Sequence, residues 1–233
     1  MWKKEIRRII TQYSNPICHL CGLSKDSKSG DLIWCQSCLL LFLAKPRCCQ
    51  CGLETLIPVA KCGVCLSEPP LWDRLFCVGD YKAPLSNYIH NLKYSGQLQY
   101  AYDLTYLLSK MIDDPAPLIV SMPLHWRRFL HRGYNQSDVL AHYLTAHLQG
   151  RSTFGQTLFK RGKSTPSQQG LDKQQRMKNL THAFTLNWSP NQTHIAIIDD
   201  VVTTGSSVRQ LCKLLLDVGV KKIDIYCICR TGT

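Results

Sequence analysis

Beyond residue 70, the hydrophobic positions alternate between short continuous runs and runs at helical spacing. Short apolar runs of the strand type lie at residues 76–81, 118–122, 194–198 and 221–230. Apolar residues at helical spacing occupy the segments 83–94, 98–112, 137–149 and 206–218. Gly150 and Gly219 follow the last two of these segments, as is typical at the end of a helix. Strands that alternate with helices favour a parallel sheet covered by helices, so we expect an α/β domain over residues 71–233.

Residues 1–70 lack this alternation and are rich in cysteine instead. Eight of their cysteines form CxxC pairs, which are Cys18/Cys21, Cys35/Cys38, Cys48/Cys51 and Cys62/Cys65. The stretch CHLCGL at 18–23 recurs as CCQCGL at 48–53, and a second CxxC pair follows each copy. This pattern indicates an internal duplication and a separate N-terminal domain over residues 1–70.

The paired cysteines have the spacing of metal ligands. A CxxC turn lets two thiolates reach one tetrahedral ion, and the glycine that follows permits a tight backbone. The repeat predicts two structural Zn²⁺ ribbons, with the ligand sets Cys18/Cys21/Cys35/Cys38 and Cys48/Cys51/Cys62/Cys65. An interleaved pairing stays open, and so does Cys49 as a ligand in place of Cys48. Redox-active dithiols are the alternative to metal binding.

The charge is unevenly distributed along the chain. Its formal net value is +12, and residues 121–182 hold ten basic but only two acidic side chains. A solvated basic face is the simplest interpretation of such a surplus. The concentration of charge also suits a polyanionic partner, either a highly phosphorylated small molecule or a nucleic acid backbone.

Targeting signals are not evident. The longest apolar stretch, CLLLFLA at 38–44, is far shorter than the roughly 20 residues of a membrane-spanning helix. The start, MWKKEIRRIITQYSNP, mixes charged and apolar positions and lacks the apolar core of a signal peptide. We therefore expect a soluble, cytoplasmic protein, where thirteen cysteines suit metal binding better than disulfides.

Two adjacent carboxylates follow one of the predicted strands. In IAIIDDVVTTGSS at 195–207, Asp199 and Asp200 end the apolar run, and a turn of small hydroxyl residues leads into the next helix. Ligands of parallel sheets bind beyond the carboxyl ends of the strands. Backbone N–H groups at a helix N-terminus attract phosphate, and Gly205 permits its close approach. Because carboxylates suit sugar hydroxyls or Mg²⁺, a sugar phosphate would satisfy both halves of the stretch.

This stretch resembles the phosphoribosyl pyrophosphate (PRPP) signature of type I phosphoribosyltransferases at all 13 positions. The resemblance implies that Asp199 and Asp200 are the catalytic acids, facing the ribose hydroxyls of PRPP bound with Mg²⁺. It also implies a ligand-binding loop that consists of Val201, Val202, Thr203, Thr204, Gly205, Ser206 and Ser207. Within this loop, residues 203–207 would hold the 5′-phosphate.

Further segments resemble the ComF family of competence proteins. They are the cysteine-rich start, SMPLHWRRFLHRGYNQS at 121–137 and KRGKSTPSQQGLDKQQRMKNLTHAF at 160–184. RGYNQS at 132–137 is the most specific marker, and LKYSG at 92–96 is a weaker one. The resemblance covers nearly the entire chain. It implies a role in DNA uptake during natural transformation, with PRPP, single-stranded DNA and the DNA-uptake machinery at the inner membrane as partners.

Basic side chains are concentrated in the same segments. The turn at 122–125 corresponds to the pyrophosphate loop of the family fold. The candidates for neutralising pyrophosphate or a nucleic acid backbone are Arg127, Arg128, Arg132, Arg161, Lys163 and Arg176. Arg132 and Arg161 are favoured because they lie inside motifs, whereas Asn135 and Gln136 suit helix capping equally well. The interleaved aromatic residues Trp126, Phe129 and Tyr134 suit base stacking, and the composition of 161–170 suits a mobile lid.

The sequence leaves the chemistry of the site open. The half that would bind the PRPP donor is visible, but no segment is evident that would select an acceptor. The alternative to a DNA-uptake role is therefore a working phosphoribosyltransferase that acts on an unidentified base, amine or nucleotide.

Overall fold

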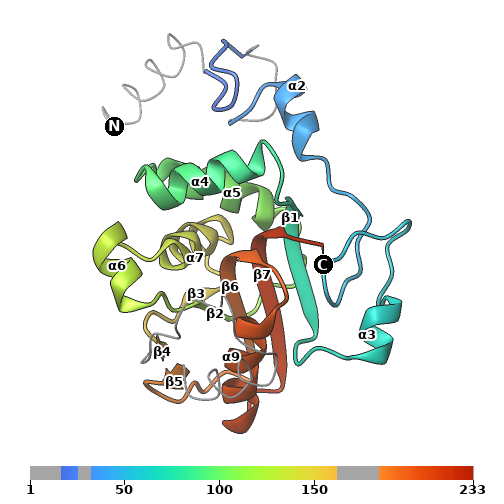
Figure 1. The fold of residues 1–233 in the computed structure, drawn as a ribbon, viewed down its shortest axis with the longest axis vertical. Helices are drawn as coiled ribbons and strands as arrows, with labels where there is room; N and C mark the ends of the chain where they lie inside the picture. The colour runs from blue at the N-terminus through green and yellow to red at the C-terminus, as the bar shows by residue number, and fades with distance from the viewer. Residues whose placement is uncertain (1–16, 26–32, 162–183, 233) are drawn as a thin grey trace, which may run out of the picture. The chain divides into compact units, whose positions relative to one another are not determined.

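The computed structural model describes residues 17–25, 33–161 and 184–232 (Figure 1). The chain divides into two compact units, Met1–Ala44 and Lys45–Thr233. The first unit contains α2 (Gln36–Leu39), which begins inside the CxxC turn of Cys35 and Cys38, and η1 (Leu40–Phe42), which follows that turn. Trp34 and Phe42 pack there with their ring centroids 4.9 Å apart.

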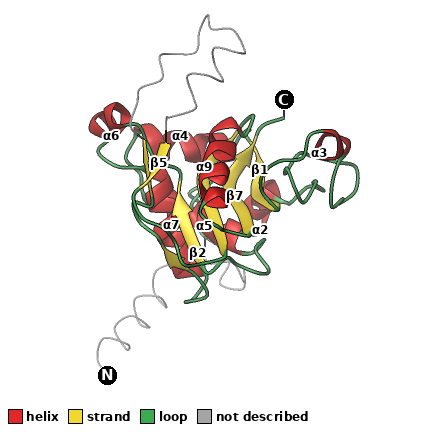
Figure 2. Ribbon diagram, turned by 90° about the horizontal axis from the view of Figure 1, so that it is seen from below, coloured by secondary structure: helices red, strands yellow, loops and turns green. Residues whose placement is uncertain are grey.

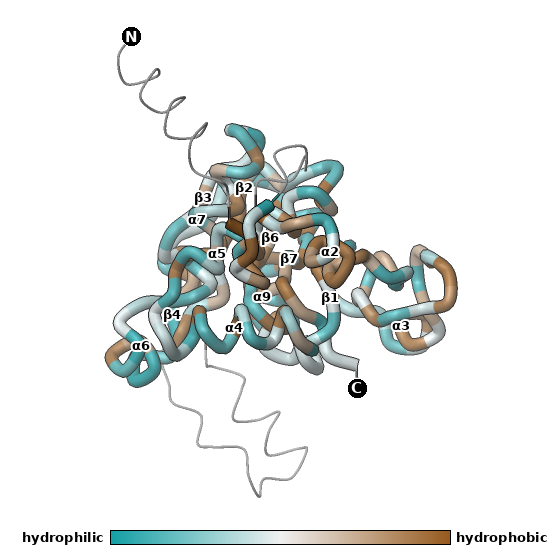
Figure 3. The backbone as a smooth tube through the Cα atoms, turned by 90° about the horizontal axis from the view of Figure 1, so that it is seen from above, coloured by the Kyte–Doolittle hydropathy of each residue, from teal (hydrophilic) through white to brown (hydrophobic). Residues whose placement is uncertain are grey.

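A five-stranded parallel sheet forms the centre of the second unit. Its order is β1-β7-β6-β2-β3, formed by β1 (Arg74–Asp80), β7 (Lys222–Arg230), β6 (His194–Val202), β2 (Leu118–Ser121) and β3 (Thr153–Phe154). The inner strands β6 and β7 are buried along almost their whole length. Strands buried on both faces need continuous apolar runs, which is why these segments lack the alternation of an exposed sheet (Figure 3).

Helices cover both faces of this sheet. On one face, α5 (Gln99–Ser109) and α7 (Gln136–His147) contact each other and the strands, and α4 (Leu85–Tyr94) contacts α5 (Figures 1 and 2). On the other, α9 (Ser206–Asp217) places Leu211 and Leu215 in a buried cluster with Ile195 and Ile197 of β6. That cluster contains no residue of α5 or α7, so the two helix layers lie on opposite faces. The predicted α/β fold with a helix-covered parallel sheet is confirmed.

Three features at the carboxyl edge of the sheet differ from the expectation. A helix, α6 (Trp126–Arg132), follows β2, and a small antiparallel pair forms from β4 (Phe159–Arg161) and β5 (Phe184–Leu186). The strand β6 was expected to end at Ile198 but runs to Val202. Pairing with β7 extends it, because Asp199 lies opposite Cys227 and Val202 lies opposite Arg230.

The second cysteine-rich segment belongs to the same compact unit as the sheet. It contains α3 (Gly63–Ser67), and the Leu75 N–H of β1 donates to the carbonyl of Cys49 at 2.9 Å. Arg47 forms an ion pair of 2.7 Å with Asp80 at the far end of β1. The contacts divide the chain at residue 44, because these bonds attach the second copy of the repeat to β1. The domain boundary near residue 70 stays a prediction.

Candidate functional site

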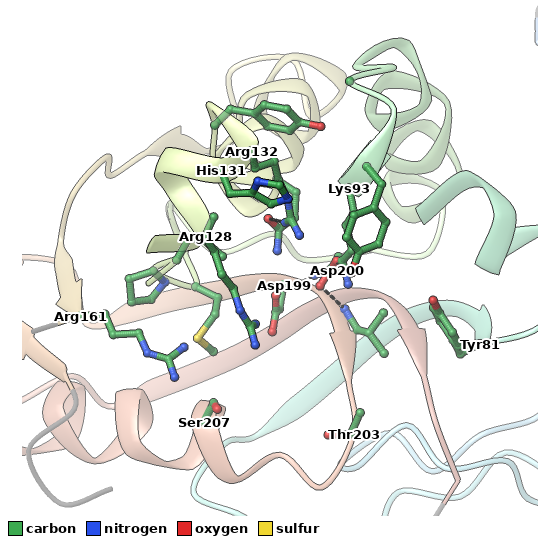
Figure 4. Close-up of a pocket in the computed structure, with 18 of the residues that line it drawn as sticks. Tyr81, Lys93, Arg128, His131, Arg132, Arg161, Asp199, Asp200, Thr203 and Ser207 are labelled. Carbon is green, nitrogen blue, oxygen red and sulfur yellow. Dashed lines mark hydrogen bonds and ion pairs between the residues drawn. The ribbon is translucent and has the colours of Figure 1, made fainter. Parts of the chain in front are cut away.

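A cleft of about 780 Å³ opens at the carboxyl edge of the sheet (Figure 4). It lies where the C-terminal end of β6 faces α4, α6 and β4. The residues of the predicted site that line it are Asp199, Asp200, Val201, Thr203, Ser207, Arg132 and Arg161. The other predicted loop residues, Val202, Thr204, Gly205 and Ser206, are not among its lining residues. The structure thus brings the two acids, part of the hydroxyl loop and the two favoured arginines to one cavity.

The two adjacent carboxylates have different partners. They occupy consecutive positions of β6, where side chains alternate in direction. The Lys93 ammonium of α4 lies 2.5 Å from Asp200 Oδ2, and the Ser137 hydroxyl of α7 donates to Asp199 Oδ1 at 3.2 Å. Burial and the neighbouring charge of Asp200 raise the pKa of Asp199 to about 8. The two carboxyl groups are therefore tolerated side by side, because Asp200 is paired with Lys93 and Asp199 is mainly protonated at neutral pH.

Lys93 was not among the predicted site residues. It belongs to the LKYSG stretch at 92–96, whose sequence indicated only the family. The next residue, Tyr94, also lines the cleft, and its ring lies 5.5 Å from the Arg132 guanidinium carbon. The LKYSG motif was the available signal in the sequence. The pairing of Lys93 with Asp200 became evident only from the position of α4.

The hydroxyl loop turns directly into α9. Gly205 adopts a left-handed φ of +75° just before the helix, and the hydroxyls of Thr204 and Ser206 lie 3.0 Å apart. The first N–H groups of a helix have no partner within it, and their dipole favours an anion. Thr203 and Ser207 line the cleft at this point (Figure 4). The loop therefore has the features of a phosphate-binding turn.

Basic side chains form the opposite wall. The guanidinium groups of Arg128 and Arg161 extend into the cleft above Ser207 (Figure 4). The Nε atom of Arg161 is buried and has no hydrogen-bond partner among the described residues. Burial and the charge of Arg128 lower the pKa of Arg161, while the nearby Asp199 acts in the opposite direction and raises it. Neither arginine has an ion-pair partner in the part of the chain that the structure describes, and neighbouring cations of this kind favour a negatively charged ligand.

The other basic candidates are placed differently or lie outside the described residues. Arg127 does not line the cleft, and its guanidinium carbon lies 5.3 Å from the centroid of the Trp126 ring. Lys163, Arg176 and the proposed lid beyond Arg161 lie outside the described residues.

The RGYNQS motif has a structural explanation at every side chain it contributes. Gly133, at φ +83°, ends α6, and the Asn135 side chain caps α7 by accepting from Ser137 N. The Tyr134 hydroxyl donates to the Leu92 carbonyl of α4, and Arg132 donates to Gln136. The capping role considered for Asn135 is confirmed. The motif thereby links α4 and α6 to α7, whose Ser137 hydroxyl donates to Asp199.

The cysteines form two compact groups of four. In each group, Cys18/Cys21/Cys35/Cys38 and Cys48/Cys51/Cys62/Cys65, the sulfur atoms all lie within 4.8 Å of one another. The Cys51–Cys62, Cys48–Cys65 and Cys21–Cys35 sulfur pairs are 3.6, 3.9 and 3.9 Å apart. A tetrahedral ion with Zn–S bonds of about 2.3 Å requires sulfurs about 3.8 Å apart, so both groups fit zinc. The grouping follows the sequence repeat, and Cys49 is exposed, with its backbone bonded to Val59 and Leu75.

Similarity to known proteins agrees with this arrangement. Residues 139–233 match the model of the phosphoribosyl transferase domain. The DNA utilization protein YhgH of Salmonella typhi is 41% identical over 79% of this chain and 84% of its own length. YhgH of Escherichia coli K12 is 38% identical over 80% of this chain and 85% of its own length. Competence protein F of Haemophilus influenzae Rd is 33% identical over 91% of this chain and 95% of its own length.

The chain belongs to the ComF/YhgH family. It carries a phosphoribosyltransferase domain and, before it, two four-cysteine clusters. Among solved structures, a hypoxanthine phosphoribosyltransferase of Staphylococcus aureus aligns with 62% of this chain and 64% of its own, at 13% identity and a TM-score of 0.30. That likeness is too weak to support any inference about this family member.

Across the described residues, no helix combines the length and the apolar character that crossing a membrane requires.

Proposed function

We propose that this ComF/YhgH-family protein binds PRPP with Mg²⁺ in the cleft, binds single-stranded DNA beside it, and thereby aids the uptake and handling of transforming DNA. The observation that carries the proposal is the convergence of acids, hydroxyl loop and arginines on one cavity. The names of its relatives, competence protein F and DNA utilization protein, support the DNA-related role. We place this function in the cytoplasm, where thiols stay reduced, with the DNA-uptake machinery as the partner that would supply the strand.

Each part of the cleft suits one part of PRPP. Asp199 and Asp200 suit the ribose hydroxyls, and the loop from Thr203 to Ser207 suits the 5′-phosphate. Arg128 and Arg161 suit the pyrophosphate, whose charge Mg²⁺ would neutralise further when bound. Lys93 lies 2.5 Å from Asp200 and orients its carboxyl group as an acceptor for a sugar hydroxyl.

Calorimetric titration of the zinc-loaded protein with PRPP and Mg²⁺ tests the proposal. We expect saturable binding that Asp200→Asn weakens at least about tenfold, because the variant loses a charge-assisted hydrogen bond. Asp113→Asn is the matched control, since Asp113 is an exposed acid that pairs with Arg74 at the amino end of β1. Absence of PRPP binding by well-folded wild-type protein would refute this half of the proposal.

The pH dependence of binding gives a second test. The pKa of Asp199 is raised to about 8, so only about a tenth of this carboxyl is ionised at pH 7. If the carboxylate form accepts a ribose hydroxyl, affinity should rise up to about tenfold between pH 7 and pH 9. The rise should be absent in Asp199→Asn. A flat profile in the wild type would argue against contact between Asp199 and the ligand.

The DNA half of the proposal depends on α6. None of its residues is buried, and Trp126 and Phe129 are 53% and 47% exposed beside Arg127 and Arg128. Exposed aromatics interleaved with arginine suit stacking on bases and pairing with phosphates. We expect Trp126→Ala to weaken binding of a labelled single strand by about 1–3 kcal/mol. Trp188 is 40% exposed but lies outside α6, so Trp188→Ala should leave binding unchanged.

Salt provides the control for this interaction. Binding through phosphate contacts should weaken steeply as salt rises, and Arg127→Ala should make that dependence shallower. DNA affinity that does not fall with rising salt, or that the α6 variants do not change, would contradict a DNA-binding site on α6.

A working phosphoribosyltransferase is the second candidate. Tyr81 and Tyr94 line the cleft and are 42% and 67% exposed, so their rings are available to a planar acceptor. Transfer would release pyrophosphate only when a suitable acceptor is present. We would measure pyrophosphate release across a panel of bases, amines and nucleotides, with Asp199→Asn as the inactive control.

A further inference from the structure

One arginine joins the second cysteine cluster to the hydroxyl loop. Arg230, the last residue of β7, is 6% exposed. Its Nε donates to the carbonyl of Cys51 at 2.9 Å, and its Nη1 donates to the carbonyls of Val202, at 3.2 Å, and Thr203. Cys51 is one of the four clustered thiols, and Val202 and Thr203 begin the loop. A single planar fork thus fixes the cysteine turn and the loop relative to each other.

A tryptophan makes the second connection. The indole N–H of Trp72 donates to the carbonyl of Gln50 at 2.7 Å, inside the same CxxC turn. Its ring lies directly against Gly205, where an added Cβ would be 2.8 Å from the ring. Gly205 has a φ of +75° and begins α9. The turn therefore positions the ring on which the sharpest bend of the loop rests.

The backbone of the turn is itself attached to the sheet. Leu75 N–H donates to the Cys49 carbonyl, and a Cβ added to Gly52 would lie 2.3 Å from Leu75 Cδ2. The segment from Cys48 to Gly52 consequently has little freedom to move away from β1 while its fold is intact. Its own conformation depends on the four thiols being held at one point, because structural zinc sites of this kind supply much of the folding energy of their segment.

From these contacts we infer that the second cysteine cluster, when it holds its metal, is a positioning element of the phosphate-binding loop, acting through Arg230 and Trp72. The inference rests on the proposed function, since it concerns the loop assigned to PRPP. It assigns to the second cluster a role in ligand affinity that the first cluster lacks, although both clusters consist of two CxxC pairs. Loss of metal from the second cluster should loosen the loop without removing any group that faces the cleft.

Matched cysteine variants test this inference in the full-length protein. Cys62→Ser and Cys35→Ser each remove the third ligand of one cluster, and zinc content is measured for both. We expect Cys62→Ser to raise the dissociation constant for PRPP and Mg²⁺ about tenfold or more, and Cys35→Ser to change it less than about twofold. Hydrogen exchange of peptides covering residues 200–208 and 228–232 should accelerate only in Cys62→Ser.

Arginine variants separate positioning from general destabilisation. Arg230→Lys keeps the charge but cannot bridge the Cys51 and Val202 carbonyls, so affinity should fall about tenfold. Arg74→Lys is the control, because Arg74 is also a partly buried arginine but pairs with Asp224 at the amino end of β1. Wild-type affinity in a Cys62→Ser protein that has lost its metal would overturn the inference and leave the proposed function standing.

The exchange measurement also decides the matter without a ligand. If the wild type binds no PRPP, the proposed function fails, but faster exchange of residues 200–208 in Cys62→Ser would still support the structural coupling. Unchanged exchange in that variant would overturn it.

Discussion

The two four-cysteine clusters are built on the same turn and differ in what surrounds it. Gly22 and Gly52 both adopt a φ of +73°, and each donates its N–H to the first cysteine of its turn at 2.9 Å. Around Gly22, a Cβ would meet nothing within 4 Å, whereas at Gly52 it would meet Leu75 at 2.3 Å. Cys21 is exposed, and its counterpart Cys51 is buried. The CxxC turn is thus specified locally, while its role depends on the element packed against it.

The largest expected difference comes from removing one ligand at matched positions. Cys51→Ser should lower the free energy of unfolding of the sheet-containing unit by about 4 kcal/mol or more, since loss of a structural metal is among the most damaging single changes. Cys21→Ser should change it by less than about 1 kcal/mol, because Cys21 belongs to the other compact unit. Urea denaturation followed by hydrogen exchange in β6 and β7 measures both. Equal losses in the two variants would remove the distinction between the clusters.

A smaller difference is expected at the paired glycines. Gly52→Ala combines a left-handed backbone with overpacking against Leu75, and should cost about 2–4 kcal/mol. Gly22→Ala carries only the backbone cost of about 1–2 kcal/mol. Thermal denaturation of each variant at saturating zinc checks this order. A milder effect at Gly52 than at Gly22 would mean that the Leu75 side chain moves aside.

The smallest expected effect comes from exchanging one residue between the repeats. Arg47 precedes the second turn and binds Asp80 at 2.7 Å, and the equivalent residue before the first turn is Ile17. Arg47→Ile should cost about 1–2 kcal/mol, because among the described residues the Asp80 side chain then keeps Lys45 as its one ion-pair partner, at 3.3 Å. The reciprocal Ile17→Arg should be close to neutral, since Ile17 is 59% exposed. Chemical denaturation of both variants would sharpen the comparison, and a costly Ile17→Arg would contradict it.

Local patterns were sufficient wherever one segment carries the whole feature. The apolar runs predicted β1, β2, β6 and β7. The inner strands among them are continuously hydrophobic because both of their faces are buried. The CxxC spacing predicted the cysteine pairs, since each turn presents two thiols to one point, and the sequence repeat favoured the grouping of pairs that the structure has. The 13-residue stretch predicted acids and a hydroxyl loop at a strand end, and the structure places both there.

The predictions from sequence were incomplete where partners lie far apart in the chain. The pairing of Lys93 with Asp200, more than 100 residues later, had no signal beyond a short family marker. The extension of β6 through Asp199 required the neighbouring strand β7. Trp72 and Arg230 are ordinary residues in the sequence, and their contacts with the cysteine turn and the loop depend on the packing of distant segments.

The sequence by itself determined the fold class, the two groups of four cysteines and the family to which the chain belongs. These features depend on periodicity, spacing and short motifs, which are properties of neighbouring residues. Only the tertiary structure decided which cluster supports the loop, which carboxylate is paired with lysine and which is mainly protonated. Burial and charge at one point are set by segments that meet in space, so no local stretch of sequence contains them.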